Sequence, residues 1–241
     1  MEYWQELLSA EALAASAGQT LWRDAYPARL PDGSGLLLPL RDLGESAVAG
    51  LIVNQASFAV FDRLSGLLSE LARRFEPDVV VGLPTLGHGL GAEVARSLGH
   101  ANWVAPGTSR KFWYRESLSV PLTSITTPGV GRRLWLDPRL LSRLAGRRVL
   151  VVDDVVSTGT SLQAGLDLLA AAAITPVAAV AVMLQGNRWC RTLGGQVPVA
   201  GVFATPLFAR EGNAWRPRPE TSRSEDCPLE RARQSPPERN I

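Results

Sequence analysis

Two adjacent aspartates and a run of hydroxyl-bearing residues stand close together in the stretch "VLVVDDVVSTGTS". The aliphatic residues 149–152 are typical of a strand buried on both faces, so Asp153 and Asp154 are expected at its carboxyl end, where the sheet opens to solvent. Residues 157–161 follow, with Gly159 allowing close backbone approach at an expected helix start. Carboxylates accept hydrogen bonds from sugar hydroxyls, whereas hydroxyls and free N–H groups at a helix start bind phosphate. The pattern therefore predicts a site for a phosphorylated sugar.

Other interpretations explain less of this stretch. Asp, Ser and Thr commonly cap helices, but capping accounts for one or two of these residues and not for all of them. The sequence has neither G-x-x-x-x-G-K-[ST] nor a G-x-G-x-x-G that opens a helix after a strand, which argues against P-loop and dinucleotide-binding sites. A phosphatase with paired aspartates needs D-x-D spacing to place both on one side of the strand. Asp153 and Asp154 are adjacent and lack that spacing.

Alternating strand and helix patterns surround the stretch. Apolar residues at helical spacing predict a helix over residues 54–75, which Pro77 ends. Strands are also expected at residues 78–84, 101–106, 147–154 and 176–185, and helices at residues 90–99 and 161–173. These repeated units predict an α/β fold with a doubly wound parallel sheet, whose ligands bind beyond the carboxyl ends of the strands.

Three regions of the chain differ in composition. Residues 1–50 are rich in Gly and Pro, with a short amphipathic helix expected near residues 4–17, and they predict an accessory region. Residues 51–210 carry the strand–helix pattern of the core domain. Residues 211–241 are charged and Pro-rich, which predicts a disordered tail. The pattern lapses over residues 109–148, and a segment of this length is expected to be functional or to include a β-hairpin.

Composition argues against several classes of function. The 241 residues are 46% hydrophobic and 20% charged, as in globular proteins. The net charge is only +2 and the basic residues are scattered, so no nucleic-acid partner is expected. No apolar run reaches about 18 residues, so no membrane partner is expected either. The start of the chain lacks signal-peptide character and the two cysteines lack metal or disulfide spacing, which predicts a cytoplasmic location.

The stretch "VLVVDDVVSTGTS" resembles the ribose-phosphate signature of the type I phosphoribosyltransferases, and the supporting pattern covers about residues 77–185. The resemblance implies Mg²⁺-dependent transfer of the 5-phosphoribosyl group of phosphoribosyl diphosphate (PRPP) to a nitrogen of a nucleobase, with release of diphosphate, in nucleotide salvage by a homodimer. It implies that Asp153 and Asp154 are catalytic, that they hold the ribose hydroxyls, and that they bind the metal directly or through water or PRPP. The implied PRPP-binding loop comprises Val155, Val156, Ser157, Thr158, Gly159, Thr160 and Ser161.

Two further segments fall where this family has its remaining parts. "VVGLPTLGHGLG" matches the position of the diphosphate-binding loop, and "SRKFW" matches that of an Arg–Lys pair. Lys111, the only lysine of the chain, is a third catalytic candidate. The implied diphosphate-binding residues are Pro84, Thr85, Leu86, Gly87, His88, Arg110 and Lys111. The segment after Lys111 is expected to close over the site, with Arg132 and Arg133 as additional contacts.

The resemblance leaves the acceptor base open. A purine is favoured by its frequency in the family, and a pyrimidine or another nitrogen heterocycle is the alternative. Trp189 is the candidate for stacking on the base because it follows the last expected strand, with plain packing as the alternative. Residues 1–50 are expected to contribute to a hood over the base. The alternative function is that of a catalytically inactive PRPP- or nucleotide-binding regulatory protein of the same fold.

Overall fold

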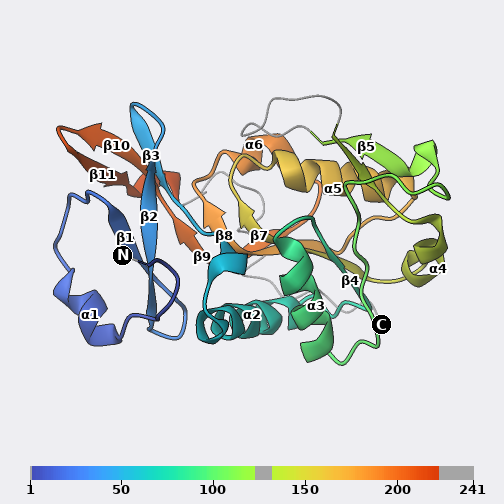
Figure 1. The fold of residues 1–241 in the computed structure, drawn as a ribbon, viewed down its shortest axis with the longest axis horizontal. Helices are drawn as coiled ribbons and strands as arrows, with labels where there is room; N and C mark the ends of the chain where they lie inside the picture. The colour runs from blue at the N-terminus through green and yellow to red at the C-terminus, as the bar shows by residue number, and fades with distance from the viewer. Residues whose placement is uncertain (1, 123–131, 223–241) are drawn as a thin grey trace, which may run out of the picture.

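The computed structural model describes residues 2–122 and 132–222 and has a parallel sheet at its centre (Figure 1). The strands of this sheet are β4 (Val79–Gly82), β7 (Val149–Val156), β8 (Ala178–Gln185) and β9 (Val199–Thr205), in the order β4-β7-β8-β9. All neighbouring strands are parallel. Every residue of β8 is buried, as expected of a strand with helices on both faces. The expected strand at residues 101–106 forms only one bridge, between Val104 and Val81.

Helices cover both faces of this sheet, which confirms the predicted doubly wound α/β fold. α2 (Phe58–Arg73) and α3 (Gly87–Ser97) pack on one face, and α5 (Thr160–Ala171) packs on the other. α2 starts after Ser57, whose hydroxyl accepts a hydrogen bond from the Val60 N–H at 3.3 Å and so caps the helix. The shorter helices are α1 (Ala10–Ala15), α4 (Leu141–Leu144), α6 (Trp189–Leu193) and the 3₁₀ turns Val53–Gln55, Glu116–Leu118, Pro138–Leu140 and Pro219–Thr221.

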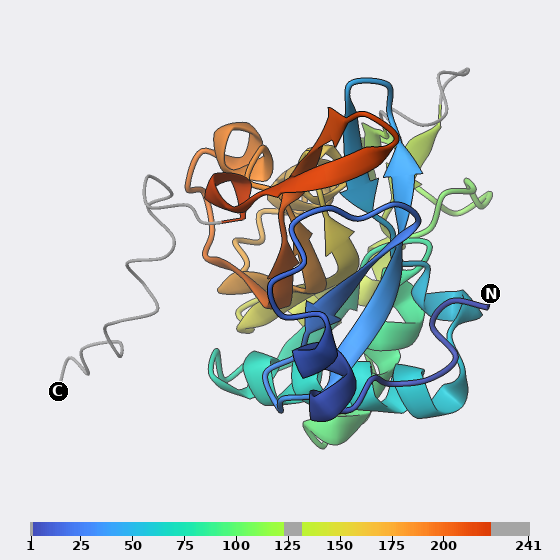
Figure 2. The same ribbon diagram turned by 90° about the vertical axis from the view of Figure 1, so that its left-hand side faces the viewer.

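A second, antiparallel sheet lies at one end of the molecule, and we call it the hood sheet (Figures 1 and 2). It consists of β1 (Ala25–Arg29), β2 (Gly35–Asp42), β3 (Ser46–Ala49), β10 (Leu207–Glu211) and β11 (Ala214–Arg218), in the order β1-β2-β3-β10-β11. Residues 1–50 therefore contribute three strands, and their helix is restricted to α1 instead of residues 4–17. The strands form because β2 buries Leu36 and Leu38 on one face, with the alternation of a half-buried strand.

The described part of the expected tail is ordered, which corrects the prediction for residues 211–222. β10 and β11 form a hairpin around Gly212, whose φ is +60°, and β10 also pairs with β3. The side chain of Trp215, in β11, is 6% exposed and packs in the main core. This one aromatic residue gives an otherwise polar segment an apolar anchor. Residues 223–241 lie outside the described residues.

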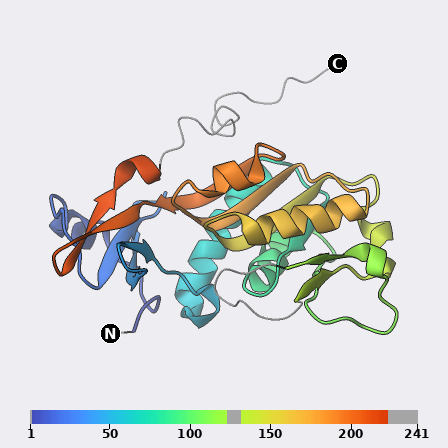
Figure 3. The same cartoon turned by 90° about the horizontal axis from the view of Figure 1, so that it is seen from above.

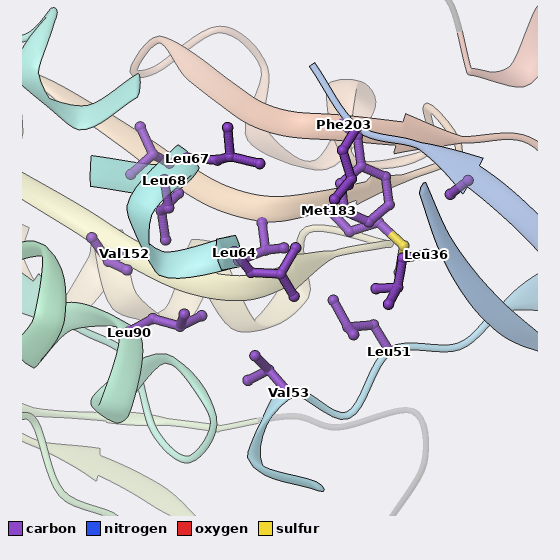
Figure 4. Close-up of a cluster of buried hydrophobic side chains, with 14 of the residues drawn as sticks. Leu36, Leu51, Val53, Leu64, Leu67, Leu68, Leu90, Val152, Met183 and Phe203 are labelled. Carbon is purple, nitrogen blue, oxygen red and sulfur yellow. The ribbon is translucent and has the colours of Figure 1, made fainter. Parts of the chain in front are cut away.

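One hydrophobic cluster runs from the hood sheet into the central sheet (Figure 4). It joins Leu36 of β2 to Leu64 of α2 and Met183 of β8, each fully buried. A second cluster fills the space between the sheet and α5. Because the hood shares its core with the sheet, residues 1–50 do not pack as a separate unit in this structure.

The expected irregular segment contains a small hairpin at the opposite end of the molecule from the hood sheet (Figure 3). It pairs β5 (Ser119–Pro121) with β6 (Arg133–Trp135), which confirms the expected hairpin. Residues 123–131, between these strands, lie outside the described residues. Within the described ranges, no helix is long and apolar enough to cross a membrane.

Candidate active site

The acidic pair lies within β7, near its carboxyl end, because the strand continues to Val156. Asp153 is only 6% exposed and Asp154 is half-buried, so the expectation that both carboxylates face solvent is wrong for Asp153. The difference arises because β8 pairs with β7 through Val156, which carries the sheet beyond the aspartates. The backbone N–H of Asp154 donates to Oδ1 of Asp153 at 2.9 Å.

Burial makes this pair hard to ionise. It raises the pKa of the Asp153 carboxyl well above its usual range, and the neighbouring charge of Asp154 raises it further. Burial also raises the pKa of Asp154. Both carboxyls therefore gain stability from a proton, from a cation, or from donors such as sugar hydroxyls. This is the electrostatic character expected of a ligand site.

The loop after the pair encloses a small cavity of about 80 Å³, lined by residues 155–162. Gly159 has a φ of +84° and directly precedes α5, so the loop's free N–H groups and the positive end of the helix dipole lie at this cavity. A side chain at position 159 would also crowd Trp189 and Thr192, whose atoms lie 3.2 Å from the position of a Cβ. The arrangement suits a phosphate group.

Three of the loop's hydroxyls already have partners. The Ser157 hydroxyl donates to Oε1 of Gln185 at 2.6 Å, and the hydroxyls of Thr158 and Thr160 lie 3.0 Å apart. The Ser157 hydroxyl and one of the two threonine hydroxyls thus already donate their protons within the protein, so an anion here would be bound by the backbone N–H groups together with the remaining hydroxyls.

The expected diphosphate loop lies directly beside Asp153. A Cβ on Gly87 would stand 2.8 Å from the Val152 carbonyl oxygen and 3.0 Å from Asp153 Oδ1, so only glycine lets the start of α3 approach β7 this closely. The peptide bond between Pro84 and Thr85 is cis. His88 is committed elsewhere: its Nε2 lies 2.9 Å from the Pro106 carbonyl oxygen and its ring packs edge-on against Trp103.

The basic residues expected at the diphosphate make other contacts. Arg110 forms an ion pair with Glu116 at 2.8 Å and lies over the Trp135 ring. Arg133 donates to Ser119 and also lies over Trp135. The side chain of Lys111 is exposed and has no hydrogen bond or ion pair with the described residues. None of these three contacts residues 84–88 through a hydrogen bond or ion pair within the described ranges, so their diphosphate role stays a prediction.

Trp189 does not lie where a base could stack on it. Its side chain is 4% exposed, its ring belongs to the cluster beneath α5, and its Nε1 donates to the Gly186 carbonyl at 3.0 Å. Its position favours the packing alternative, because Trp189 begins α6 and packs against Gly159. The stacking role is therefore not supported.

Sequence reasoning missed Gln185, the last residue of β8. Besides its bond with Ser157, Gln185 donates through Nε2 to the Ala49 carbonyl of β3 at 2.7 Å. It is 8% exposed. A signal for it was present, since Gln185 is the only polar residue in the run "AAVAVMLQ".

Comparisons with known proteins agree with this geometry. Residues 53–194 match the model of the family described as phosphoribosyl transferase domain. The chain is 31% identical over 195 residues to an adenine phosphoribosyltransferase of Saccharopolyspora erythraea, covering 77% of this chain and 94% of the relative. It is 30% identical over 139 residues to an adenine phosphoribosyltransferase of Nocardia farcinica, covering 54% of this chain and 65% of that protein.

The fold is also that of a solved structure. The adenine phosphoribosyltransferase of Giardia lamblia, complexed with 9-deazaadenine, superposes with a TM-score of 0.53 at 18% identity, covering 82% of this chain and 98% of that one. The aspartate pair, the phosphate-sized cavity and the close-packed Gly87 all fall within the residues that the family model matches. The chain therefore belongs to the phosphoribosyl transferase domain family, as the sequence resemblance predicted.

Proposed function

We propose that the protein transfers the 5-phosphoribosyl group of PRPP to a ring nitrogen of a nucleobase, with release of diphosphate. The observation that carries the proposal is the contact between three parts: a buried Asp153–Asp154 pair, the phosphate cavity that follows it and the start of α3 at Gly87. A phosphorylated sugar with a second anionic group on its anomeric carbon matches these parts: its hydroxyls match the aspartates, its phosphate matches the cavity and its second anionic group matches the start of α3.

Each part has a role in the proposed transfer. The loop of residues 157–161 holds the 5-phosphate through its N–H groups and the α5 dipole. Asp153 and Asp154 accept hydrogen bonds from the ribose hydroxyls and so orient the anomeric carbon. The bond from that carbon to diphosphate breaks, a bond to the base nitrogen forms, and the base loses a proton. Charge grows on the departing diphosphate, where the backbone N–H groups of residues 85–88 and the exposed Lys111 would stabilise it.

The donor set fits Mg²⁺ only in part. The described residues contain no group of three or more His, Cys, Asp or Glu side chains that would hold a metal alone. Two carboxylates whose pKa values are raised by burial are, however, the kind of ligands that Mg²⁺ shares with substrate oxygens and water. Asp153 and Asp154 would hold the ion together with PRPP, and the bound ion would neutralise charge on diphosphate.

A purine is the favoured acceptor, and adenine is the first base to test because the curated relatives are adenine phosphoribosyltransferases. The hood sheet, which lies beside the ends of β8 and β9, is the proposed cover of the base. The cytoplasmic location and the homodimer stay predictions.

The experiment is PRPP binding by calorimetry with Mg²⁺, followed by a screen of nucleobases for diphosphate release. We expect binding, and release with a purine. The double variant Asp153→Asn, Asp154→Asn is expected to lose PRPP binding while keeping its fold, and Asp167→Asn, on the outer side of α5, is the matched control. Binding without release for any base would favour the regulatory alternative, and failure of the wild type to bind PRPP would overturn the proposal.

A further inference from the structure

Gln185 joins the hood sheet to the phosphate loop. Its amide nitrogen donates to the Ala49 carbonyl of β3, and its amide oxygen accepts from the Ser157 hydroxyl, at 2.7 and 2.6 Å. These partners are 136 and 28 residues away from Gln185 along the chain. Both ends of one nearly buried side chain are thus used to connect two separate parts of the fold.

The connection limits what Ser157 can do for a ligand. A serine hydroxyl has one proton, and here that proton is directed at Gln185. The oxygen then faces Nη2 of Arg188 at 3.5 Å, which gives a second contact from the residue directly before α6. The Ser157 hydroxyl therefore holds the loop in place and is not free to donate to a phosphate.

The other atoms around Gln185 leave it little freedom to change partners. Ala49 is fully buried, so its carbonyl has no solvent to replace the amide donor. Rotating the Gln185 amide by half a turn would place its NH₂ group against the Ser157 hydroxyl and its oxygen against the Ala49 carbonyl, which is a repulsive pair. The observed orientation is thus the one that satisfies both partners.

We infer that Gln185 is a positioning residue that couples the hood sheet to the phosphate loop through Ala49 and Ser157. The inference rests on the proposed function, because it takes the loop as the phosphate site and the hood as the cover of the base. A displacement of either part is transmitted to the other, so the binding of phosphoribosyl group and base is linked, and the linkage is reciprocal.

A double-mutant cycle tests this inference. Ser157→Ala, Gln185→Ala and the double variant are compared with the wild type by calorimetric titration with ribose 5-phosphate, which needs no turnover. Ser157→Ala is expected to weaken binding about threefold to tenfold, the loss of one hydrogen bond, and Gln185→Ala at least as much, because it also loses the bond to Ala49. The double variant is expected to bind no more weakly than Gln185→Ala alone. Losses that multiply in the double variant would overturn the inference, since they would mean that the two side chains act independently.

Gln163→Ala is the matched control. Gln163 is also a glutamine near the loop, but its amide bonds Asp167 and Gln196 at the surface, and its removal is expected to leave the affinity unchanged. An equal loss in this control would overturn the inference, because the effect would then be general to the region.

Ser157→Ala keeps the test decisive if Gln185→Ala does not fold, since Ser157 is half-buried and its removal leaves the Gln185–Ala49 bond intact. In turnover with PRPP and adenine, Ser157→Ala is expected to raise KM for the base as well as KM for PRPP. A rise for PRPP alone would overturn the coupling.

If the wild type releases no diphosphate with any base, the transferase assignment fails, while the ribose 5-phosphate cycle still decides whether Gln185 positions the loop. If the wild type does not bind ribose 5-phosphate, both the proposed function and this inference fail.

Discussion

Asp153 places a carboxyl where the folded protein disfavours its charge. An aspartate in an unfolded chain has a pKa of about 3.9, and burial together with the charge of Asp154 raises the pKa of Asp153 in the folded protein. The folded state therefore retains a proton at pH values where the unfolded chain has lost it. The stability contributed by this proton is fully present below about pH 4 and is lost as pH rises through the folded pKa.

The first prediction concerns Asp153→Asn. The amide keeps an oxygen for the Asp154 N–H and removes the charge, so the variant is expected to be inactive yet more stable near pH 8 than the wild type. Each kcal/mol gained in the free energy of unfolding raises Tm by about 2 to 4 °C for a chain of this size. Melting curves between pH 4 and pH 8 measure this. A wild type and variant whose Tm values change in parallel with pH would contradict the argument.

Gly87 controls how closely the start of α3 approaches the aspartates. A methyl group there would stand 2.8 Å from the Val152 carbonyl oxygen, so Gly87→Ala must move the helix or the strand. We expect a loss of about 1 to 3 kcal/mol in the free energy of unfolding and a fall of about tenfold or more in kcat/KM for PRPP.

Denaturant unfolding and initial rates check this second prediction. Gly66→Ala is the matched control: Gly66 lies within α2, and a Cβ there meets nothing within 4 Å. That variant is expected to be as stable as the wild type or slightly more stable, because alanine favours a helix. A Gly87→Ala protein that behaves like the control would show that the close approach has no functional role.

Single residues differ in how well the sequence predicted them. Asp153, Asp154 and the loop after them are contiguous, so their shared location follows from local chain geometry. The role of Gln185 depends on Ala49 and Ser157, which are far from it in sequence, and the burial of Trp189 depends on how α6 packs against Gly159. Such contacts arise from tertiary packing, which single-sequence periodicity does not contain.

At the level of elements, the same distinction separates β4, β7 and β8 of the central sheet from β9 and the hood sheet, which were not predicted. β4, β7 and β8 were predicted because each is a short apolar run next to a helical pattern. The hood strands were missed because their pairing joins residues near the start of the chain to β10 and β11. In addition, Gly- and Pro-rich turns interrupt the alternating pattern by which strands are recognised. β11 was missed for a further reason: its exposed residues are polar and only Ala214 and Trp215 are buried.

The third prediction concerns the molecule as a whole. Leu36 in the hood sheet and Leu64 in α2 are both fully buried in one cluster, so the hood and the central sheet are expected to unfold together. Leu36→Ala and Leu64→Ala should each cost about 2 to 5 kcal/mol and lower the midpoint of the same single calorimetric transition. A separate low-temperature transition in Leu36→Ala alone would show that the hood melts independently.

The pairing of β3 with β10 also sets an order of events during synthesis. β3 ends at Ala49, whereas β10 begins at Leu207, so the edge of β3 has no partner until nearly all of the described chain has left the ribosome. At ordinary rates of translation this interval is on the order of ten seconds. During that time the nascent chain exposes an unpaired strand edge next to the apolar side chains of β2, the kind of surface that chaperones bind.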